Sequence, residues 1–191
     1  MLRLFVGLPL PEGVRKILLS RMGGFPDVRW QDDRQLHLTL RFLGNVKENQ
    51  ATDIDLALKG LPFEPFELKL EGTGLFGTLR KPRLIWAGVD PLAPLVDLVR
   101  KMEAAVVRTG LPPETRNYTP HITIARCHQH SALINQFLDE TADLTSPPWV
   151  VDHFVLFRSH LGHKAARYQE VSRYPATPKD PGRPAGPKNN V

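Results

Sequence analysis

Two short stretches, Leu36-His37-Leu38-Thr39-Leu40 and Pro120-His121-Ile122-Thr123-Ile124, share the order His-apolar-Thr-apolar. Because successive side chains of a β-strand point to opposite faces, the histidine and the threonine of each stretch share one face. The apolar residues then point the other way, into a core. A strand pattern repeated in two halves of the chain indicates two related lobes. If these lobes face each other, two imidazoles and two hydroxyls meet in one cleft.

Around these stretches, short apolar strands alternate with helical segments. Most connections are short, and no complete glycine-rich phosphate loop precedes a helix, since Gly72-Thr73-Gly74 is typical of a turn. The pattern predicts an α+β fold with antiparallel sheets rather than a doubly wound parallel sheet. We expect strands at Leu2–Leu8, Val28–Gln31, Leu36–Leu43, Phe66–Leu70, Arg83–Val89, His121–Ala125, Trp149–Arg158 and Tyr168–Ser172, and helices at Glu12–Met22, Asn49–Leu58, Leu92–Thr109 and Ala132–Leu138.

The end of the chain has a different composition. Residues 175–191 contain five prolines and two glycines, and such a segment cannot bury a core. We therefore expect one domain, residues 1–174, followed by a flexible tail, residues 175–191.

Composition excludes several classes of protein. Of the 191 residues, 41% are hydrophobic and 24% are charged, as in ordinary globular domains, so wholesale disorder is excluded. A single cysteine, Cys127, excludes an intrachain disulfide and favours a reducing, cytoplasmic location. The chain has no apolar run of about 18 residues, so we expect no membrane span. The net charge of +5 permits an anionic ligand without by itself indicating a nucleic-acid binder.

The His–Thr pairs suggest acid–base chemistry. Histidine titrates near neutral pH, so one imidazole can accept a proton while the other donates one. Threonine hydroxyls beside them can donate hydrogen bonds to phosphoryl oxygens, where charge builds up in the transition state. A phosphodiester can react in this way without a metal or another cofactor. A single His-x-Thr on a strand more often marks a half-buried structural histidine, but a second copy with matching flanks favours function.

These motifs and their flanks resemble the 2H phosphoesterase superfamily, which is named for two His-x-Thr-x motifs. The resemblance is closest to its RNA 2',3'-cyclic phosphodiesterases, also called 2'-5' RNA ligases. It extends over nearly the whole chain up to the tail, and neither motif departs from the pattern. The matching segments are Arg3–Leu8, Val28–Trp30, His37–Gly44, Pro82–Gly88 and Pro120–Arg126.

The resemblance implies two similar α+β lobes around a central cleft, with helices on the outside. It also implies hydrolysis of a 2',3'-cyclic phosphate, on RNA or on a nucleotide, to a 2'-phosphate. By this analogy His121 is the general base that activates water, and His37 is the general acid that protonates the departing 3' oxygen. Thr39 and Thr123 would bind the non-bridging oxygens. With a 5'-hydroxyl as nucleophile, the reverse reaction would form a 2'-5' bond.

Five further residues are candidates for binding the substrate. Arg126 ends the second motif and could neutralise a phosphate, or it could be a solvated strand end. Arg41 lies on the His37 face by parity and could contact the ligand or form a salt bridge. In similar enzymes an aromatic residue near Tyr168 lies close to the substrate, although a core tyrosine fits equally well. Phe5 and Trp30 could stack on a base, but strand aromatics usually belong to the core.

Two histidine pairs, His128 with His130 and His160 with His163, raise the question of a metal site. On a strand, His-x-His can chelate Zn²⁺. No cluster of carboxylates or cysteines accompanies either pair, and both are expected in loops. We therefore expect no functional metal.

Several alternatives for the function remain open. The substrate could be a 2'-5' oligoadenylate or an ADP-ribose cyclic phosphate, since specificity depends on loops that the motifs do not describe. The protein could also bind RNA ends or nucleotides without turnover, or be a metal hydrolase. We expect a monomer that acts on RNA ends or nucleotides carrying a 2',3'-cyclic phosphate, away from membranes.

Overall fold

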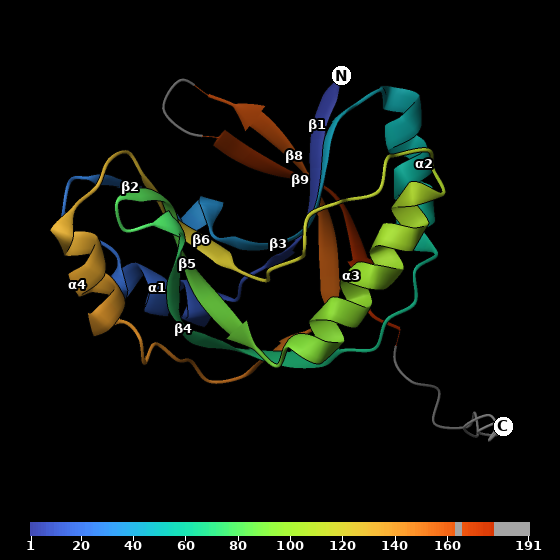
Figure 1. Ribbon diagram of the computed structural model, residues 1–191. Coiled ribbons are helices and arrows are strands. Elements are labelled where there is room, and N and C mark those ends of the chain that lie inside the picture. Colours follow the sequence, from blue (N-terminus) through green and yellow to red (C-terminus); the bar gives the residue numbers. More distant parts are fainter. Residues whose placement is uncertain (163–165, 178–191) are drawn as a thin grey trace, which may run out of the picture.

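The computed structural model describes residues 1–162 and 166–177 of the protein (Figure 1). The elements, in chain order, are β1 (Leu2–Pro9), α1 (Glu12–Arg21), β2 (Val28–Trp30), a 3-10 turn η1 (Asp33–Gln35), β3 (His37–Val46), α2 (Glu48–Lys59), β4 (Phe66–Thr78), β5 (Lys81–Asp90), α3 (Leu92–Val107), β6 (Ile122–Cys127), α4 (Ala132–Glu140), β7 (Trp149–Val151), β8 (His153–Leu161) and β9 (Ala166–Pro175).

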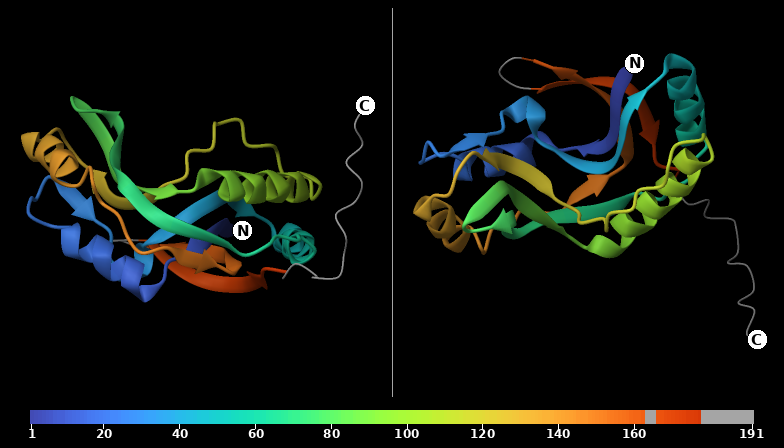
Figure 2. Two further views of the ribbon diagram at one scale, coloured as in Figure 1. Left: turned by 90° about the horizontal axis from the view of Figure 1, so that it is seen from below. Right: turned by 45° about the horizontal axis from the view of Figure 1, so that its top comes forward.

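The strands form one curled sheet in the order β7-β4-β5-β6-β3-β1-β8-β9, with β2 added beside β6 (Figure 2). All the strand pairs are antiparallel. The predicted α+β fold with antiparallel pairing is therefore confirmed. Each half of the sheet forms one lobe, and the halves meet where β3 pairs with β6 through a single residue pair, Leu38 with Ile122.

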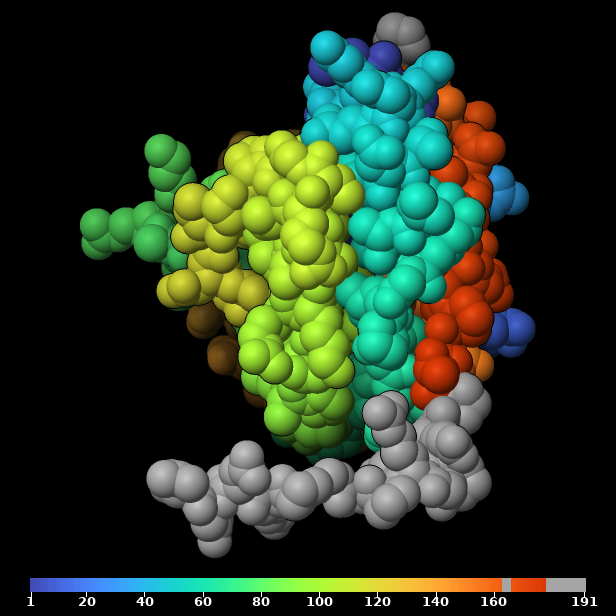
Figure 3. All heavy atoms as spheres, turned by 90° about the vertical axis from the view of Figure 1, so that its right-hand side faces the viewer, coloured from blue at the N-terminus to red at the C-terminus, as the bar shows by residue number. Residues whose placement is uncertain are grey.

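The helices gather at the two ends of the molecule. α1 and α4 lie at one end, and α2 and α3 lie side by side at the other (Figures 1 and 3). In α3, the buried residues Leu95, Leu98, Met102 and Val106 recur at helical spacing, as the sequence predicted. Gly110 follows with a φ of 87°, which only glycine adopts without strain.

β4 is longer than predicted and contains the three residues that were expected to form a turn. Gly72 and Thr73 lie at a register shift of the β4–β5 ladder, so the chain bulges there and continues as a strand. Gly74 lies against the Trp86 indole, and a Cβ placed there would come within 2.2 Å of the ring. The prediction of a turn is wrong because these glycines allow a bulge and a close approach.

Two boundaries near the C-terminus also differ from the expectation. The single strand predicted from Trp149 to Arg158 is interrupted at Asp152, which separates β7 from β8. Pro175 still belongs to β9, and the next residues are bonded to the fold. The Ala176 N–H donates to the Asp152 carbonyl at 2.6 Å, and the Thr177 N–H donates to the Phe63 carbonyl at 2.9 Å. The rest of the predicted tail lies outside the described residues.

In the part of the chain that the structure describes, no helix is long and apolar enough to cross a membrane.

Replacing Gly74 with alanine should destabilise the protein, because the new methyl group must displace the Trp86 ring. Overpacking of this kind costs about 1–3 kcal/mol. Urea denaturation measures the free energy of unfolding. Gly13→Ala is the matched control, since an added Cβ there meets nothing within 4 Å and the position is helical. Its stability should be unchanged or higher. Equal stability of the Gly74→Ala variant and the wild type would contradict this account.

Candidate active site

The joint between β3 and β6 determines which residues face the cleft. Leu38 and Ile122 pair across it, and both are fully buried in the core. Because strand side chains alternate, the residues on either side of each of them point to the opposite face of the sheet. The joint therefore buries the apolar residues of both motifs and turns their polar residues towards the cleft.

The antiparallel register relates the two motifs by approximate two-fold symmetry. Since Leu38 faces Ile122, continuing the register by one residue in each direction places His37 opposite Thr123 and Thr39 opposite His121. Each histidine is thus matched with the threonine of the other motif. The structure brings together the four residues that the sequence pattern predicted to meet.

Both imidazoles are held in the same way through Nδ1. His37 Nδ1 lies 2.7 Å from the Gln35 carbonyl oxygen, and His121 Nδ1 lies 2.7 Å from the Thr119 carbonyl oxygen. A carbonyl only accepts, so each neutral ring carries its proton on Nδ1 and leaves Nε2 as the basic atom. His37 Nε2 lies 3.0 Å from the Thr39 hydroxyl, which donates to it.

Both histidines are weaker bases than usual. The pKa of His37 is lowered to about 4, mainly by burial and also by repulsion from a charged His121 and from Arg126, while the bond to the Gln35 carbonyl acts in the opposite direction. Burial also lowers the pKa of His121, against the effect of the Thr119 carbonyl. Near pH 7 the unliganded site therefore holds two neutral imidazoles.

Aromatic rings enclose His37. The rings of Phe5 and Tyr168 each lie 4.9 Å from the imidazole, and Phe157 lies at 6.2 Å. Phe5 is only 2% exposed, so its ring offers no face to a base, and the prediction that it stacks on substrate is wrong. Tyr168 is half-buried and lies beside His37, and its contact with substrate stays a prediction. Burial raises the pKa of its hydroxyl.

A hollow of about 240 Å³ opens beside His37. Tyr168, Phe157 and Leu36 supply apolar surface to it. Its charged lining consists of two cations and two acids, Arg15, Arg34, Asp33 and Glu170. The hollow is large enough for part of a small polar ligand, and its lining offers both apolar and charged groups to such a ligand.

Trp30 does not face the cleft. Its indole contacts Phe25 at 5.4 Å and Phe137 at 5.2 Å, which places it in the core beneath α4. Base stacking by Trp30 is therefore wrong, and the alternative of a core aromatic is confirmed.

On the other side of the cleft, Phe76 lies against His121. The two ring centroids are 4.8 Å apart and nearly perpendicular, and Trp86 supports Phe76 at 5.7 Å. Phe76 was not predicted as a site residue, because the predicted strand ended at Leu70. The signal for a longer hairpin was weak, since its two turn residues, Leu79 and Arg80, are not typical turn formers.

Arg126 reaches the cleft face through a β-bulge. It lies three residues after Thr123, so a regular strand would point the two side chains in opposite directions. The β5–β6 ladder shifts register between Ile85 and Trp86, and the shift returns Arg126 to the face of Thr123. Its charge is close enough to lower the pKa of His37. The structure therefore places Arg126 where it could contact a bound phosphate.

The Arg41 side chain is only 11% exposed, and each of its N–H groups donates a hydrogen bond to a protein acceptor. Its Nε and Nη2 donate to the Glu103 carboxylate, at 2.6 and 3.5 Å, and Nη1 donates to Glu114 at 3.3 Å. The remaining two N–H groups donate to the carbonyls of Phe42 and Pro112. A guanidinium has five N–H donors, so none remains for a phosphate. The ligand contact predicted for Arg41 is wrong, and the salt-bridge alternative is confirmed.

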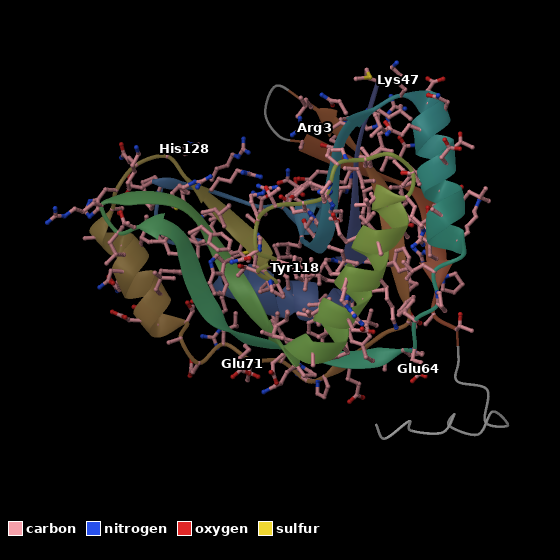
Figure 4. All side chains as sticks on the ribbon, turned by 45° about the vertical axis from the view of Figure 1, so that its right-hand side comes forward. Arg3, Lys47, Glu64, Glu71, Tyr118 and His128 are labelled. Atoms are coloured by element: carbon pink, nitrogen blue, oxygen red, sulfur yellow. The ribbon has the colours of Figure 1, made fainter. Side chains whose placement is uncertain are left out.

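These contacts fasten the loop that leads into the second motif. The loop between α3 and β6 passes over β3, and its Tyr118 hydroxyl donates to the Thr39 carbonyl at 3.1 Å (Figure 4). The Glu114 N–H donates to Glu103 at 2.7 Å. The next residue after Tyr118 is Thr119, whose carbonyl orients His121. Arg41 thus connects the strand of the first motif with the approach to the second.

The histidine pairs outside the cleft do not form a metal site in the described residues, where no group of three or more histidine, cysteine or acidic side chains could hold an ion. His128 and His130 are exposed. His163 lies outside the described residues.

The curled sheet with paired His-x-Thr strands at its centre is the fold of the 2H phosphoesterases. A profile of the 2'-5' RNA ligase superfamily matches residues 25–163, and the chain belongs to this superfamily. The resemblance that the motifs indicated is therefore confirmed.

Individual relatives agree over most of the chain. An RNA 2',3'-cyclic phosphodiesterase of Geobacillus stearothermophilus is 30% identical over 186 residues, which are 94% of this chain and 59% of that protein. The chain thus spans less than two thirds of that relative. An RNA 2',3'-cyclic phosphodiesterase of Archaeoglobus fulgidus is 26% identical over 173 residues, which are 89% of this chain and 98% of that protein.

Solved structures agree as well. E. coli LigT complexed with 3'-AMP superposes with a TM-score of 0.75 and 27% identity, over 92% of this chain and 98% of that one. A protein of Thermus thermophilus gives a TM-score of 0.78 and 28% identity, over 93% of this chain and all of that one.

Replacing Arg41 with methionine should lower the free energy of unfolding by about 2–4 kcal/mol, because two carboxylates lose their buried partner. Urea denaturation provides the measurement. Arg100→Met is the matched control, since that arginine pairs with Asp97 on an exposed helix surface and should contribute less than about 0.5 kcal/mol. Equal losses in the two variants would contradict the role assigned to Arg41.

Proposed function

We propose that the protein hydrolyses 2',3'-cyclic phosphates of RNA ends or nucleotides to 2'-phosphomonoesters, without a metal. The observation that carries this proposal is the reciprocal placement of the two His–Thr pairs across the β3–β6 joint. Such a placement offers an acid and a base on opposite sides of one phosphorus atom. The names of the relatives from Geobacillus and Archaeoglobus support the choice of substrate.

In the proposed reaction, Nε2 of His121 takes a proton from water as the water oxygen attacks phosphorus. The bond between phosphorus and O3' breaks, and Nε2 of His37 gives its proton to that oxygen. The product carries a phosphate on O2' and a free 3'-hydroxyl. Thr39, Thr123 and Arg126 would stabilise the negative charge on the non-bridging oxygens. Each proton transfer would contribute about 10²–10⁴ in rate.

The acid role assigned to His37 requires the substrate. With a pKa of about 4, this imidazole is neutral in the unliganded site near pH 7. An anionic phosphate beside Nε2 favours the charged ring and replaces the water lost on burial, so binding should raise the pKa of His37. Proton uptake and substrate binding are coupled in this scheme.

Ligation follows from the same geometry. If a 5'-hydroxyl of a second RNA takes the place of water, its oxygen attacks phosphorus while O3' leaves, and a 2'-5' bond forms. In this direction the histidines keep their roles, since His121 takes the proton of the 5'-hydroxyl and His37 gives one to O3'. Cleavage of the 2'-5' bond back to the cyclic phosphate is the reverse reaction, and in it the two histidines exchange roles.

The first test is hydrolysis of an RNA oligonucleotide that ends in a 2',3'-cyclic phosphate, in the presence of EDTA. His37→Ala and His121→Ala should each lower kcat by about 10²–10⁴-fold, because each removes one proton transfer. His128→Ala is the control, since this exposed histidine lies outside the cleft, and it should retain full activity. Identification of the product should give a 2'-phosphate. Turnover that persists in both cleft variants would refute the mechanism.

The dependence of kcat/KM on pH should be bell-shaped with an optimum below about 6.5, the ordinary pKa of histidine. Both cleft histidines have lowered pKa values in the free enzyme. The rate should fall at low pH, where the base becomes protonated, and should fall again as pH rises through the higher pKa, where the acid loses its proton. The optimum of kcat should lie at higher pH, because bound phosphate raises these pKa values. An optimum of kcat/KM above about pH 7.5 would contradict the environments described for the two rings.

A further inference from the structure

The tip of the β4–β5 hairpin, Gly77–Arg83, stands clear of the rest of the molecule. All of its residues except Pro82 are exposed, including the apolar Leu79. Figure 3 shows these side chains projecting beyond the neighbouring surface. A projecting hairpin contributes little to the core, so its side chains are free to contact a partner.

The hairpin tip is positively charged, and no acidic side chain in the described part of the chain is paired with it. Arg80, Lys81 and Arg83 lie on it, and the chain contains no acidic residue between Glu71 and Asp90. Within the described residues, none of these three cations forms a salt bridge or a side-chain hydrogen bond. By contrast, the cations of α2 and α3 are paired with acids of their own helices, as in Lys59 with Asp55. Three unpaired like charges repel one another, and a bound anion relieves that repulsion.

The positive charge continues from the hairpin tip to the active site. The cross-strand register places Phe76, Leu84, Arg126 and Arg29 in one row, each opposite the next. One end of this row is the phenylalanine whose ring contacts His121. Arg126 and Arg29 are both exposed. A polyanion that enters the cleft along this row meets positive charge at Arg126, beside the histidines, and again at the hairpin tip.

The hairpin tip lies well away from the histidine pair, where the reacting phosphate would bind. Arg80 follows Phe76 by four residues along the hairpin, which corresponds to about 13 Å of extended chain. Arg80 and Lys81, at the end of the hairpin, are therefore too far from the histidine pair to touch a phosphate undergoing reaction. Only a ligand with several phosphates in a chain can occupy both places.

We propose that the hairpin tip binds backbone phosphates of single-stranded RNA beyond the reacting nucleotide, so that the enzyme prefers RNA ends to free cyclic nucleotides. This inference rests on the proposed function and adds a specificity determinant to it. The contacts are to phosphate and carry no base preference. They act on binding, so they should change kcat/KM through KM and leave kcat unchanged.

The test compares two substrates with one double variant, Arg80→Gln/Lys81→Gln, which removes the two cations at the end of the hairpin. The substrates are a mononucleoside 2',3'-cyclic phosphate and an oligonucleotide of about ten residues with the same cyclic end. The variant should hydrolyse the mononucleotide within about two-fold of the wild-type rate. Its kcat/KM for the oligonucleotide should fall about ten-fold or more at low salt. The salt dependence of log(kcat/KM) should become shallower by about 1.4, because two phosphate contacts on a single strand are lost.

A matched control removes the same charge elsewhere. Arg100→Gln/Lys101→Gln changes α3 at the other end of the molecule, and it should leave the ratio of the kcat/KM values for the two substrates unchanged. The proposal would be overturned if the hairpin variant lost kcat/KM equally for both substrates, or lost none for either. So would a loss of the same size in the control, which would reflect net charge alone.

Binding without turnover separates this inference from the proposed function. A fluorescent oligonucleotide with an ordinary 3'-hydroxyl end reports binding by anisotropy and needs no chemistry. Wild type should bind it more tightly than the hairpin variant does, and equal affinities would overturn the role of the tip. A wild-type protein that binds this RNA but hydrolyses neither cyclic phosphate would instead refute the proposed function.

Discussion

The single cross-strand pair between Leu38 and Ile122 is the contact on which the arrangement of the site depends. It joins the two halves of the sheet and buries one apolar residue of each motif. The polar residues beside them consequently share the opposite face, and the antiparallel register matches each histidine with the threonine of the other motif. A slip of one residue in either strand would exchange the faces and place the imidazoles in the core. The register between β3 and β6 therefore determines the geometry of the site as well as the fold.

The packing that orients the histidines also determines their charge. Phe5 and Tyr168 exclude water from His37, and exclusion of water is the main reason that its pKa is low. The empty cleft is therefore close to neutral at its centre, with the charge of Arg126 nearby. An anion entering it gains a positive neighbour and makes protonation of an imidazole more favourable. The site is oriented before the substrate arrives, but it acquires its full charge only with the substrate.

Much of this arrangement could be predicted from the sequence, because alternation along strands and helical spacing are local properties. The two motifs, the apolar face of α3 and the antiparallel fold were predicted for this reason. The face of the sheet to which Arg126 points could not be predicted in this way, because the bulge that determines it depends on the pairing of two distant strands. The role of Arg41 depends on carboxylates 62 and 73 positions away in the chain. The β1–β3 ladder also shifts register between Thr39 and Arg41, so parity along the strand gave neither its face nor its partners. Gly74 was misread because the Trp86 ring that requires it lies on another strand.

The approximate symmetry of the motifs ends at the walls of the cleft. The backbone holds both histidines alike, through a carbonyl two residues earlier. Their surroundings differ, since three aromatic rings lie near His37 and, in the described part of the chain, only Phe76 lies near His121. The more open ring is the one that water or a second RNA end can approach, and this suits the proposed base. The enclosed ring suits an acid that acts on an oxygen of the bound ribose. Two nearly identical sequence motifs can therefore take different roles because different strands supply their neighbours.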